Sequence, residues 1–365
     1  MPREAPAISG VTVGSYTIPT DAPEADGTIE WSSTTLVVVE ANAGDVTGLG
    51  YTYASGAAAI VVRDTLAPLV AGGSAFDVAR HHAAMVRAVR NIGRSGIAAC
   101  AISAVDAALW DLKARLLDLP LAALLGARRE RVAIYGSGGF TSYPDRRTIA
   151  QFEGWTDLGC RLMKMKVGAE PERDPARMRA VREALPEIGL MIDANGALTP
   201  RQALAMAEAA APLGVVWFEE PVSHDDTAGL AAVRQGLPAG IELAAGEYAY
   251  DQWDALRLAA AGCVDVLQLD ASRCCGITGF LAAAAVADAH HLPVSAHTAP
   301  ALHLAPSLAA PRLRHVEWFH DHARIEAMLF DGAPQPKDGT IAADPSRPGH
   351  GLVLKRQDAD AYADA

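Results

Sequence analysis

The sequence lacks the features that mark nucleic-acid-binding and disulfide-bonded proteins. It has 31 Lys and Arg residues against 43 Asp and Glu residues, which gives a net charge of −12, and it contains no long basic block. A chain of this charge is not expected to bind nucleic acid. The five cysteines are odd in number and irregularly spaced. This pattern predicts reduced thiols in a cytoplasmic protein rather than a disulfide framework.

Long apolar segments are also missing. The apolar stretches are rich in alanine and are interrupted by charged residues or proline, so we expect no membrane-spanning helix. The first residues show no basic region followed by an apolar core, so we expect no signal peptide. The chain has 365 residues, of which 50% are apolar and 20% charged. This is enough material for one large or two medium globular domains.

Residues 1–128 predict an α+β domain. The run at 34–40 is apolar and rich in β-branched residues, which predicts a strand. Two long alanine- and leucine-rich patterns at 77–91 and 97–125 predict helices. The second pattern is interrupted at Pro120, where we expect a new short helix to begin.

The sequence pattern changes from residue 129. Short apolar runs now alternate with alanine-rich helical patterns, which predicts parallel β-α-β units. Eight such units over residues 129–325 predict a closed (β/α)8 barrel of the TIM type. We expect a Pro/Gly-rich tail at 326–365, returning to the first domain, in place of a clear last barrel helix. The eight predicted strands are 132–136, 162–167, 189–193, 215–219, 242–246, 264–269, 293–296 and 315–318.

Three of these strands are followed by a carboxylate. Asp193, Glu219 and Glu247 recur at one β/α period, and active sites of such barrels lie at this end of the strands. Oxygen ligands alone favour Mg²⁺ over Zn²⁺. The alternative is that the carboxylates cap the following helices. Glu220 is expected to point to the opposite face, away from the metal ligands.

Two lysines, Lys164 and Lys166, alternate with methionines in the second predicted barrel strand. Side chains alternate along a strand, so both lysines face the same way. Inside the barrel, burial and the neighbouring ammonium would lower the pKa of a lysine and make it a base. The alternative is an exposed edge strand with solvated lysines.

A second acid–base group is expected at the ends of later strands. Asp270 and His297 follow neighbouring strands, and an aspartate bonded to a histidine fixes its tautomer and supports its protonated form. Glu317, after the last strand, could donate a proton to a developing oxyanion if it is held neutral. Ser137 and Asn195 also follow barrel strands and complete the set of polar groups at this end.

Together these motifs resemble the enolase superfamily and, within it, the mandelate racemase subgroup. The resemblance implies that residues 1–128 form a capping domain and that Asp193, Glu219 and Glu247 bind Mg²⁺. It implies that Lys166 and the His297–Asp270 pair act as bases on opposite faces of a small-molecule carboxylate substrate. It also implies a homo-oligomer, either a dimer or an octamer. The residues that carry the resemblance are Lys164, Lys166, Asp193, Asn195, Glu219, Glu220, Pro221, Gly246, Glu247, Asp270, His297 and Glu317.

Further roles follow from the resemblance. Lys164, Ser137 and Glu317 are expected to contact the substrate carboxylate. The muconate-lactonizing subgroup is disfavoured, because it places a lysine after the sixth strand, where this chain has Asp270, and lacks the histidine after the seventh strand. The shared step is removal of the proton α to the carboxylate. Dehydration of an acid sugar to a 2-keto-3-deoxy acid is favoured by analogy, with racemisation or epimerisation of a 2-hydroxy acid as the alternative.

Substrate specificity is expected to reside in the first domain. The segments 17–31 and 50–54 are predicted to be loops that cap the barrel mouth, with Tyr51 and Tyr53 as substrate contacts alongside Asn195. Their hydroxyls and acids suit a polyol, although Arg273 could pair with a second substrate carboxylate. The alternative is that both loops are solvated surface. His320 and His322 are predicted to be loop residues, with contact to the substrate as a further role open to them.

Two functions from other classes are alternatives to the predicted enzyme activity. A non-catalytic descendant is disfavoured because the set of site residues is complete. A metal-dependent hydrolase is disfavoured because the first barrel strand has no histidine pair.

Overall fold

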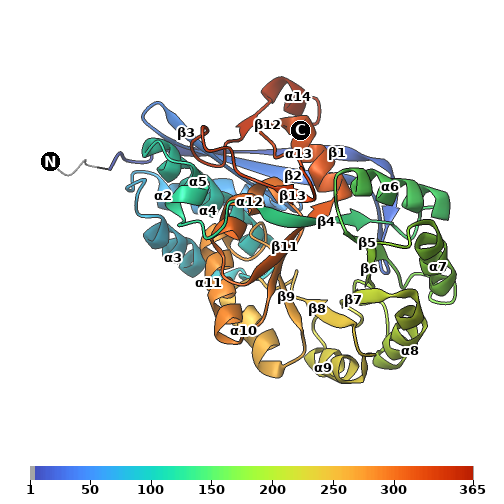
Figure 1. Ribbon diagram of the computed structural model, residues 1–365. Coiled ribbons are helices and arrows are strands. Elements are labelled where there is room, and N and C mark those ends of the chain that lie inside the picture. Colours follow the sequence, from blue (N-terminus) through green and yellow to red (C-terminus); the bar gives the residue numbers. More distant parts are fainter. Residues whose placement is uncertain (1–4, 365) are drawn as a thin grey trace.

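The computed structural model describes residues 5–364 and begins with a three-stranded antiparallel sheet (Figure 1). The sheet runs in the order β1, β2, β3. Helices follow it in sequence and cover one of its faces. The elements of this capping domain are β1 (Gly10–Ala25), β2 (Glu30–Ala43), β3 (Val46–Tyr53), α1 (Ala57–Val61), the π-helical turn η1 (Val62–Leu66), α2 (Ala67–Val70), α3 (Val78–Ala88), the 3₁₀ turn η2 (Val89–Asn91), α4 (Ile97–Leu116) and α5 (Leu121–Leu124).

The apolar run in β2 is continuous because both of its faces are buried. Leu36 and Val38 pack into the cluster that includes the barrel core, whereas Val37 and Val39 pack against the capping helices. Alternate side chains of a strand point to opposite faces. The sheet is therefore the middle layer between the capping helices and the barrel.

The second domain is a closed barrel of parallel strands, β4 to β11, because β11 pairs with β4. This confirms the predicted fold class, and each predicted barrel strand coincides with an observed one. Its elements are β4 (Val132–Gly138), α6 (Asp145–Asp157), β5 (Leu162–Lys166), α7 (Asp174–Ala184), β6 (Gly189–Asp193), α8 (Pro200–Ala210), η3 (Ala211–Leu213), β7 (Val215–Glu219), α9 (Thr227–Gly236), β8 (Glu242–Ala245), α10 (Gln252–Ala261), β9 (Val266–Leu269), α11 (Gly276–Ala289), β10 (Val294–Ala296), α12 (Pro300–Ala309) and β11 (Leu313–Phe319).

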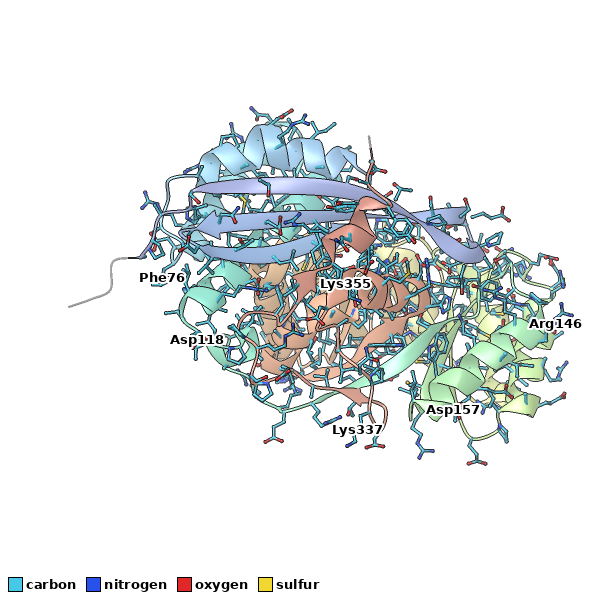
Figure 2. All side chains as sticks on the ribbon, turned by 90° about the horizontal axis from the view of Figure 1, so that it is seen from above. Phe76, Asp118, Arg146, Asp157, Lys337 and Lys355 are labelled. Carbon is cyan, nitrogen blue, oxygen red and sulfur yellow. The ribbon has the colours of Figure 1, made fainter. Side chains whose placement is uncertain are left out.

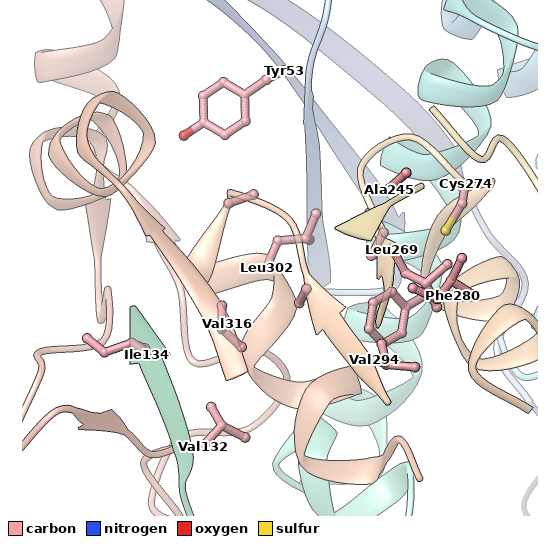
Figure 3. Close-up of a cluster of buried hydrophobic side chains, with 14 of the residues drawn as sticks. Tyr53, Val132, Ile134, Ala245, Leu269, Cys274, Phe280, Val294, Leu302 and Val316 are labelled. Carbon is pink, nitrogen blue, oxygen red and sulfur yellow. The ribbon is translucent and has the colours of Figure 1, made fainter. Parts of the chain in front are cut away.

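Two hydrophobic layers fix the barrel. Outward-facing strand residues such as Val294 and Val316 pack against the helices, and Phe280 and Leu302 bring helical side chains into the same cluster (Figure 3). Inward-facing residues form a smaller cluster of Tyr135, Met191, Trp217, Ala244 and Val266. Along β5, β6 and β7 the inward positions that follow are polar. The barrel interior is thus filled by a cluster of mainly apolar side chains, and polar side chains line it at the carboxyl ends of the strands.

The segments expected to be capping loops are strands. Residues 17–31 lie in β1, in β2 and in the turn between them, where the Asp26 amide donates to the Ile29 carbonyl over 3.1 Å. Residues 50–53 belong to β3 and pair with β2. The prediction for 17–31 was wrong because its polar and mostly solvent-accessible side chains resemble those of a loop. The prediction for 50–54 was wrong because residues 50–53 are buried and paired with β2, and this partner lies elsewhere in the sequence.

The last barrel strand is followed by a helix, α13 (His320–Leu329), and not directly by a tail. Its Ile325 and Leu329 are buried, so it packs as a barrel helix despite the polar residues around them. His320 and His322 therefore lie in a helix, and the prediction that they are loop residues was wrong. The predicted boundary at residue 326 falls inside this helix.

The C-terminal segment runs from the barrel to the capping domain. Its elements are β12 (Phe330–Asp331), β13 (Thr340–Ile341), β14 (Val353–Leu354) and α14 (Arg356–Asp360). β13 adds to β4 of the barrel, and the Thr17 amide in β1 donates to the Tyr362 carbonyl over 2.8 Å. Figure 2 shows the same path, with Lys337 on the barrel side and Lys355 beside the capping sheet. Within residues 5–364, no helix has the length and apolar composition needed to cross a membrane.

Candidate active site

The three predicted metal ligands meet at the carboxyl ends of the strands. Asp193 pairs with Lys166 on one side and with Glu219 on the other in the strand register. One carboxylate oxygen from each of Asp193, Glu219 and Glu247 lies within 4.8 Å of the other two, and all three residues are buried. A buried all-oxygen set of this size fits a hard divalent cation such as Mg²⁺. Within the described chain, Glu247 Oε2 accepts no hydrogen bond, and His297 Nε2 lies 3.2 Å from it as a charge contact.

Lys164 and Lys166 share one face of β5, as predicted, and both contact these carboxylates. Lys164 Nζ lies 2.6 Å from Glu219 and 2.9 Å from Glu317, and Lys166 Nζ lies 2.6 Å from Asp193. Burial alone would lower the pKa of each lysine, but the surrounding carboxylates raise the pKa of both above the ordinary value. The expected lowering was wrong for these protein groups, because the anions outweigh the second ammonium.

His297 and Asp270 form the predicted pair. His297 Nδ1 lies 2.8 Å from Asp270 Oδ2, and Asp270 Oδ1 accepts from the Ser272 amide and hydroxyl over 2.7 Å each. His297 Nε2 lies 3.2 Å from Glu247. Burial opposes protonation, but Glu247 and Asp270 outweigh it and raise the pKa of His297 to about 10. These two carboxylates therefore favour the protonated, cationic form of the histidine.

Glu317 is charged rather than neutral. Its burial would raise its pKa, but Lys164 and His297 overcome that effect and lower the pKa to about 2. The Thr298 amide also donates to Glu317 Oε2 over 3.0 Å. The prediction that Glu317 is held as a neutral acid was wrong for this site, because a buried ammonium lies beside it.

The predicted substrate contacts divide into two groups. Asn195 and Tyr53 line the cavity above the metal ligands. Ser137 is fully buried on β4, and its hydroxyl has no hydrogen-bond partner among residues 5–364. Tyr51 is fully buried outside the cavity lining, and its hydroxyl donates to Glu326 over 2.6 Å. Tyr51 is thus removed from the predicted substrate contacts, because pairing in β3 turns it towards α13.

Glu220 lies in surroundings that differ from those predicted from the sequence. It is buried, and burial together with the charges of Glu247 and Asp193 raises its pKa well above the ordinary value. Its φ of +35° ends the strand alternation directly after Glu219. The expected opposite orientation assumed a continuing strand, and a backbone turn at this position is not visible in the sequence.

The cavity joins the two domains and has a volume of about 350 Å³. The turn of the β1–β2 hairpin reaches the barrel mouth, because a Cβ on Gly27 would lie 2.7 Å from the Val167 carbonyl and closer still to that of Ala194. Most of the cavity lining that comes from the capping domain could not be predicted from the sequence, because its position depends on the docking of this turn. The lining residues are Asp26, Ile29, Trp31, Ser33, Thr34, Thr35, Tyr53, Ala54, Ser55, Lys166, Asn195, Glu247, Tyr248, Arg273, His297, Thr298, Glu317, Phe319 and His322.

The two histidines of α13 have different surroundings. His322 lines the cavity and stacks on Tyr53, with ring centroids 3.5 Å apart. His320 Nε2 lies 3.1 Å from Asp21 in β1, outside the cavity lining. Arg273 also lines the cavity, but it lies 3.3 Å from Glu247 and 3.5 Å from Asp270. Its position beside these two carboxylates makes it part of the support for the site.

Two family models match the chain. One, described as "Enolase C-terminal domain-like", matches residues 147–359. The other, described as "Mandelate racemase / muconate lactonizing enzyme, N-terminal domain", matches residues 14–126. The two matches fall on the barrel and on the capping domain respectively.

Curated relatives include two bacterial enzymes of sugar-acid chemistry. The 3,6-anhydro-alpha-L-galactonate cycloisomerase of Streptomyces coelicolor is 34% identical over 84% of this chain and 85% of its own length. The L-talarate/galactarate dehydratase of Salmonella typhimurium is 34% identical over 78% of this chain and 73% of its own length.

Solved structures show the same relationship. A mandelate racemase/muconate lactonizing enzyme-like protein from Rubrobacter xylanophilus is 49% identical, with a TM-score of 0.96 over 98% of this chain and 100% of its own. A racemase from Streptomyces coelicolor with bound magnesium is 31% identical, with a TM-score of 0.92 over 98% of this chain and 100% of its own. Magnesium, the predicted cofactor, is thus present in a related structure. The chain belongs to the enolase superfamily, in its mandelate racemase and muconate lactonizing enzyme branch, as its strand-end residues predicted.

Proposed function

We propose that the protein is a Mg²⁺-dependent acid sugar dehydratase. The observation that carries the proposal is the presence of two acid–base groups, Lys166 and the His297–Asp270 pair, beside one buried set of three carboxylates. Lys166 on β5 and His297 on β10 lie three strands apart around the closed barrel. A substrate between them would present opposite faces of its α-carbon to the two groups.

Asp193, Glu219 and Glu247 would hold the metal, and the fit rests on their buried oxygens, one from each residue, which lie within 4.8 Å of one another. When bound, Mg²⁺ supplies positive charge beside the substrate carboxylate, which stabilises the charge that develops there after deprotonation. Lys164, buried between Glu219 and Glu317, adds a second fixed cation. Ser137 offers an unpaired hydroxyl from the neighbouring strand. These groups would orient the carboxylate end of the substrate.

The first chemical step is removal of the proton on the α-carbon. Lys166 takes this proton as a neutral amine, a form that a cation held by Asp193, Glu219 and Glu247 would favour by offsetting the carboxylate charges that raise the pKa of Lys166. The electron pair of the broken C–H bond moves into the carboxylate to give an enediolate. The hairpin of the capping domain lies against the barrel mouth beside the cavity, and this cover would limit the access of bulk water to the enediolate.

The second step is loss of water from the β-carbon. His297 Nε2 points into the cavity, and as an imidazolium it donates its proton to the departing β-hydroxyl. The C–O bond breaks, water leaves, and the enediolate electron pair forms the new C–C double bond. The resulting enol takes up a proton at the β-carbon, loses the proton of its α-hydroxyl, and becomes a 2-keto-3-deoxy acid. Asp270 keeps the imidazole in the tautomer that this step needs.

Racemisation or epimerisation is the second candidate. It uses the same first step and differs only in that His297 returns a proton to the opposite face of the α-carbon. The placement of acid–base groups on two sides of the barrel supports this outcome for a substrate without a leaving group on its β-carbon. The related cycloisomerase and dehydratase support acid-sugar chemistry more directly.

One experiment separates these possibilities. The protein is incubated with Mg²⁺ and a library of acid sugars in D₂O and followed by ¹H NMR. Appearance of keto-acid signals supports the dehydratase, and deuterium at Cα without loss of water supports the racemase or epimerase. Absence of both reactions, together with absence of Mg²⁺ binding by calorimetry, would overturn the proposed function. Assembly into a homo-oligomer and a cytoplasmic location stay predictions from the sequence.

A further inference from the structure

The far wall of the cavity determines which acid sugars can enter. Lys164 and the three metal ligands fix one end of the substrate, the carboxylate end. The other end faces the capping domain, whose contribution to the cavity comes from β2, β3 and the turn between β1 and β2. Its hydroxyl and aromatic groups include Trp31, Thr34 and Tyr53.

The donors of Trp31, Thr34 and Tyr53 are already used, and the two serine hydroxyls of the wall belong to the exposed residues Ser33 and Ser55. Trp31 Nε1 donates to Glu24 over 2.9 Å, and the Thr34 hydroxyl donates to Asp321. The Tyr53 hydroxyl is directed at the His322 carbonyl at 3.4 Å. The lone pairs of the Thr34 hydroxyl remain available to accept a bond. A substrate hydroxyl can donate to such an acceptor, whereas an ionised carboxylate has no proton to donate.

The basic residues that line the cavity are also committed. Lys166 contacts Asp193, His297 contacts Asp270, and Arg273 lies beside Glu247. His322 is stacked on Tyr53, and burial holds its pKa well below the ordinary value, so it is neutral. Among the described lining residues, no other Lys, Arg or His is present. A second substrate carboxylate would therefore meet no unpaired cation.

The surroundings of the wall do not supply the missing positive charge. Asp26 itself lines the cavity, and its carboxylate accepts from the Thr28 hydroxyl and the Ile29 amide over 2.9 Å each. Behind the wall, Arg324 is paired with Asp321. An anion placed in this environment without a partner is strongly disfavoured.

Building on the proposed function, we infer that the substrate is a monocarboxylic acid sugar, an aldonate or its deoxy or anhydro form, whose distal end is an uncharged group. The hydroxyl of Thr34 accepts a hydrogen bond from that end, and Trp31 packs beside it. Aldarates, which carry a carboxylate at both ends, are rejected because the wall places the acidic Asp26 and no unpaired cation where the second carboxylate would lie.

The test uses pairs of substrates that differ only at the distal carbon. Each C5 and C6 aldonate is compared with the aldarate of the same configuration, for example D-gluconate with D-glucarate, at saturating Mg²⁺. We expect kcat/KM for the preferred aldonate to exceed that of its matched aldarate by 100-fold or more. An aldarate that reacts as well as its aldonate would overturn the inference and leave the proposed function standing. If neither class reacts or exchanges its Cα proton, the proposed function itself fails.

A gain-of-cation variant tests the physical cause. Ile29 lies at the cavity rim and is 63% exposed, so Ile29→Arg is expected to fold normally. It supplies an unpaired guanidinium and should reduce the aldonate-to-aldarate ratio by 10-fold or more. Ile29→Gln controls for size, and Ile92→Arg, at a 62% exposed site outside the cavity lining, controls for net charge. An unchanged ratio in folded Ile29→Arg would count against the inference.

Discussion

His297 is held by two carboxylates that act on different ring atoms. Asp270 fixes Nδ1, and Nε2 faces Glu247 and the cavity. Nε2 is therefore the atom that exchanges protons with a substrate. Sequence reasoning found this pair because both residues end neighbouring strands, and strand ends can be read from periodicity alone.

The variant His297→Asn should separate the two chemical steps. Asparagine keeps a polar side chain but cannot transfer a proton, so we expect water loss to slow by roughly 100-fold or more. Deuterium exchange at Cα should continue, because Lys166 still removes the proton. NMR in D₂O measures both rates. His291→Asn is the matched control, because His291 is exposed and its positive φ of 59° suits asparagine. Full dehydratase activity in His297→Asn would refute the assigned role.

The carboxyl group of Glu24 should make the stability of the protein depend on pH. It is fully buried and accepts from Trp31, and its Oε1 has no partner among residues 5–364. Burial is the main effect that raises the pKa of Glu24, and the charges of Asp321 and Asp21 raise it further. The charge of Arg324 lowers it, and the net result is a pKa of about 8.

Stability should therefore fall as pH rises through this range. A raised pKa means that the folded state holds a proton that the unfolded state has lost, so the stabilisation is complete below the unfolded value near 4.5 and is lost towards pH 8. The loss is on the order of a few kcal/mol. Glu24→Gln should flatten this dependence, measured as unfolding midpoints in urea from pH 5 to pH 9. The same slope in Glu24→Gln and in the unmodified protein would contradict the role of Glu24.

At the scale of elements, the β1–β2 hairpin is the part that sequence reasoning described least well. The polar composition of residues 17–31 predicted a loop, but the two strands pair across a register shift between Pro19 and Glu24. The turn then inserts Gly27 against the backbone of the barrel. Neither the pairing nor the docking can be read locally, because each depends on a surface formed by distant residues.

Replacing Gly27 should disturb closure more than folding. In Gly27→Ala the new methyl group would meet the carbonyls of Val167 and Ala194, so the turn must move away from the barrel mouth. We expect kcat/KM to fall by about 10-fold or more, because water enters the site and the far wall shifts. The unfolding temperature should change little. Gly10→Ala, whose Cβ would meet no atom within 4 Å, is the matched control. Equal kcat/KM in both variants would show that the contact does not matter.

At the scale of the whole molecule, Mg²⁺ binding should raise the free energy of unfolding of the protein. Three buried carboxylates repel one another, and a bound cation offsets this repulsion in the folded state only. At a Mg²⁺ concentration 100 times Kd the stabilisation is about 2.7 kcal/mol. For a chain of this length it corresponds to a rise in the unfolding temperature of about 3 °C.

Glu219→Gln should abolish most of this rise, measured by calorimetry with and without Mg²⁺. Glu208→Gln, at an exposed position on α8, should keep it. A rise of the same size in Glu219→Gln would remove Glu219 from the ligand set.

The barrel and most of its strand-end residues could be predicted because both follow from repetition along the chain. Asp193, Glu219 and Glu247 share a period, and alternation alone placed Lys164 and Lys166 on one face. Properties that depend on neighbours in space could not be predicted. The charge states of Lys166 and Glu317 are set by partners from other strands, and the burial of Tyr51 is set by α13.

The cavity is shared by two separate stretches of the sequence. Its far wall comes mainly from residues between Asp26 and Ser55, whereas its proton-transferring groups lie between Lys166 and His297. The two stretches meet only in space, so one can be redesigned without rewriting the other. A library confined to the tips of the β1–β2 hairpin and of β3 would therefore diversify substrate choice while the reactive centre stays constant. This division makes the protein a suitable scaffold for directed evolution towards new sugar acids.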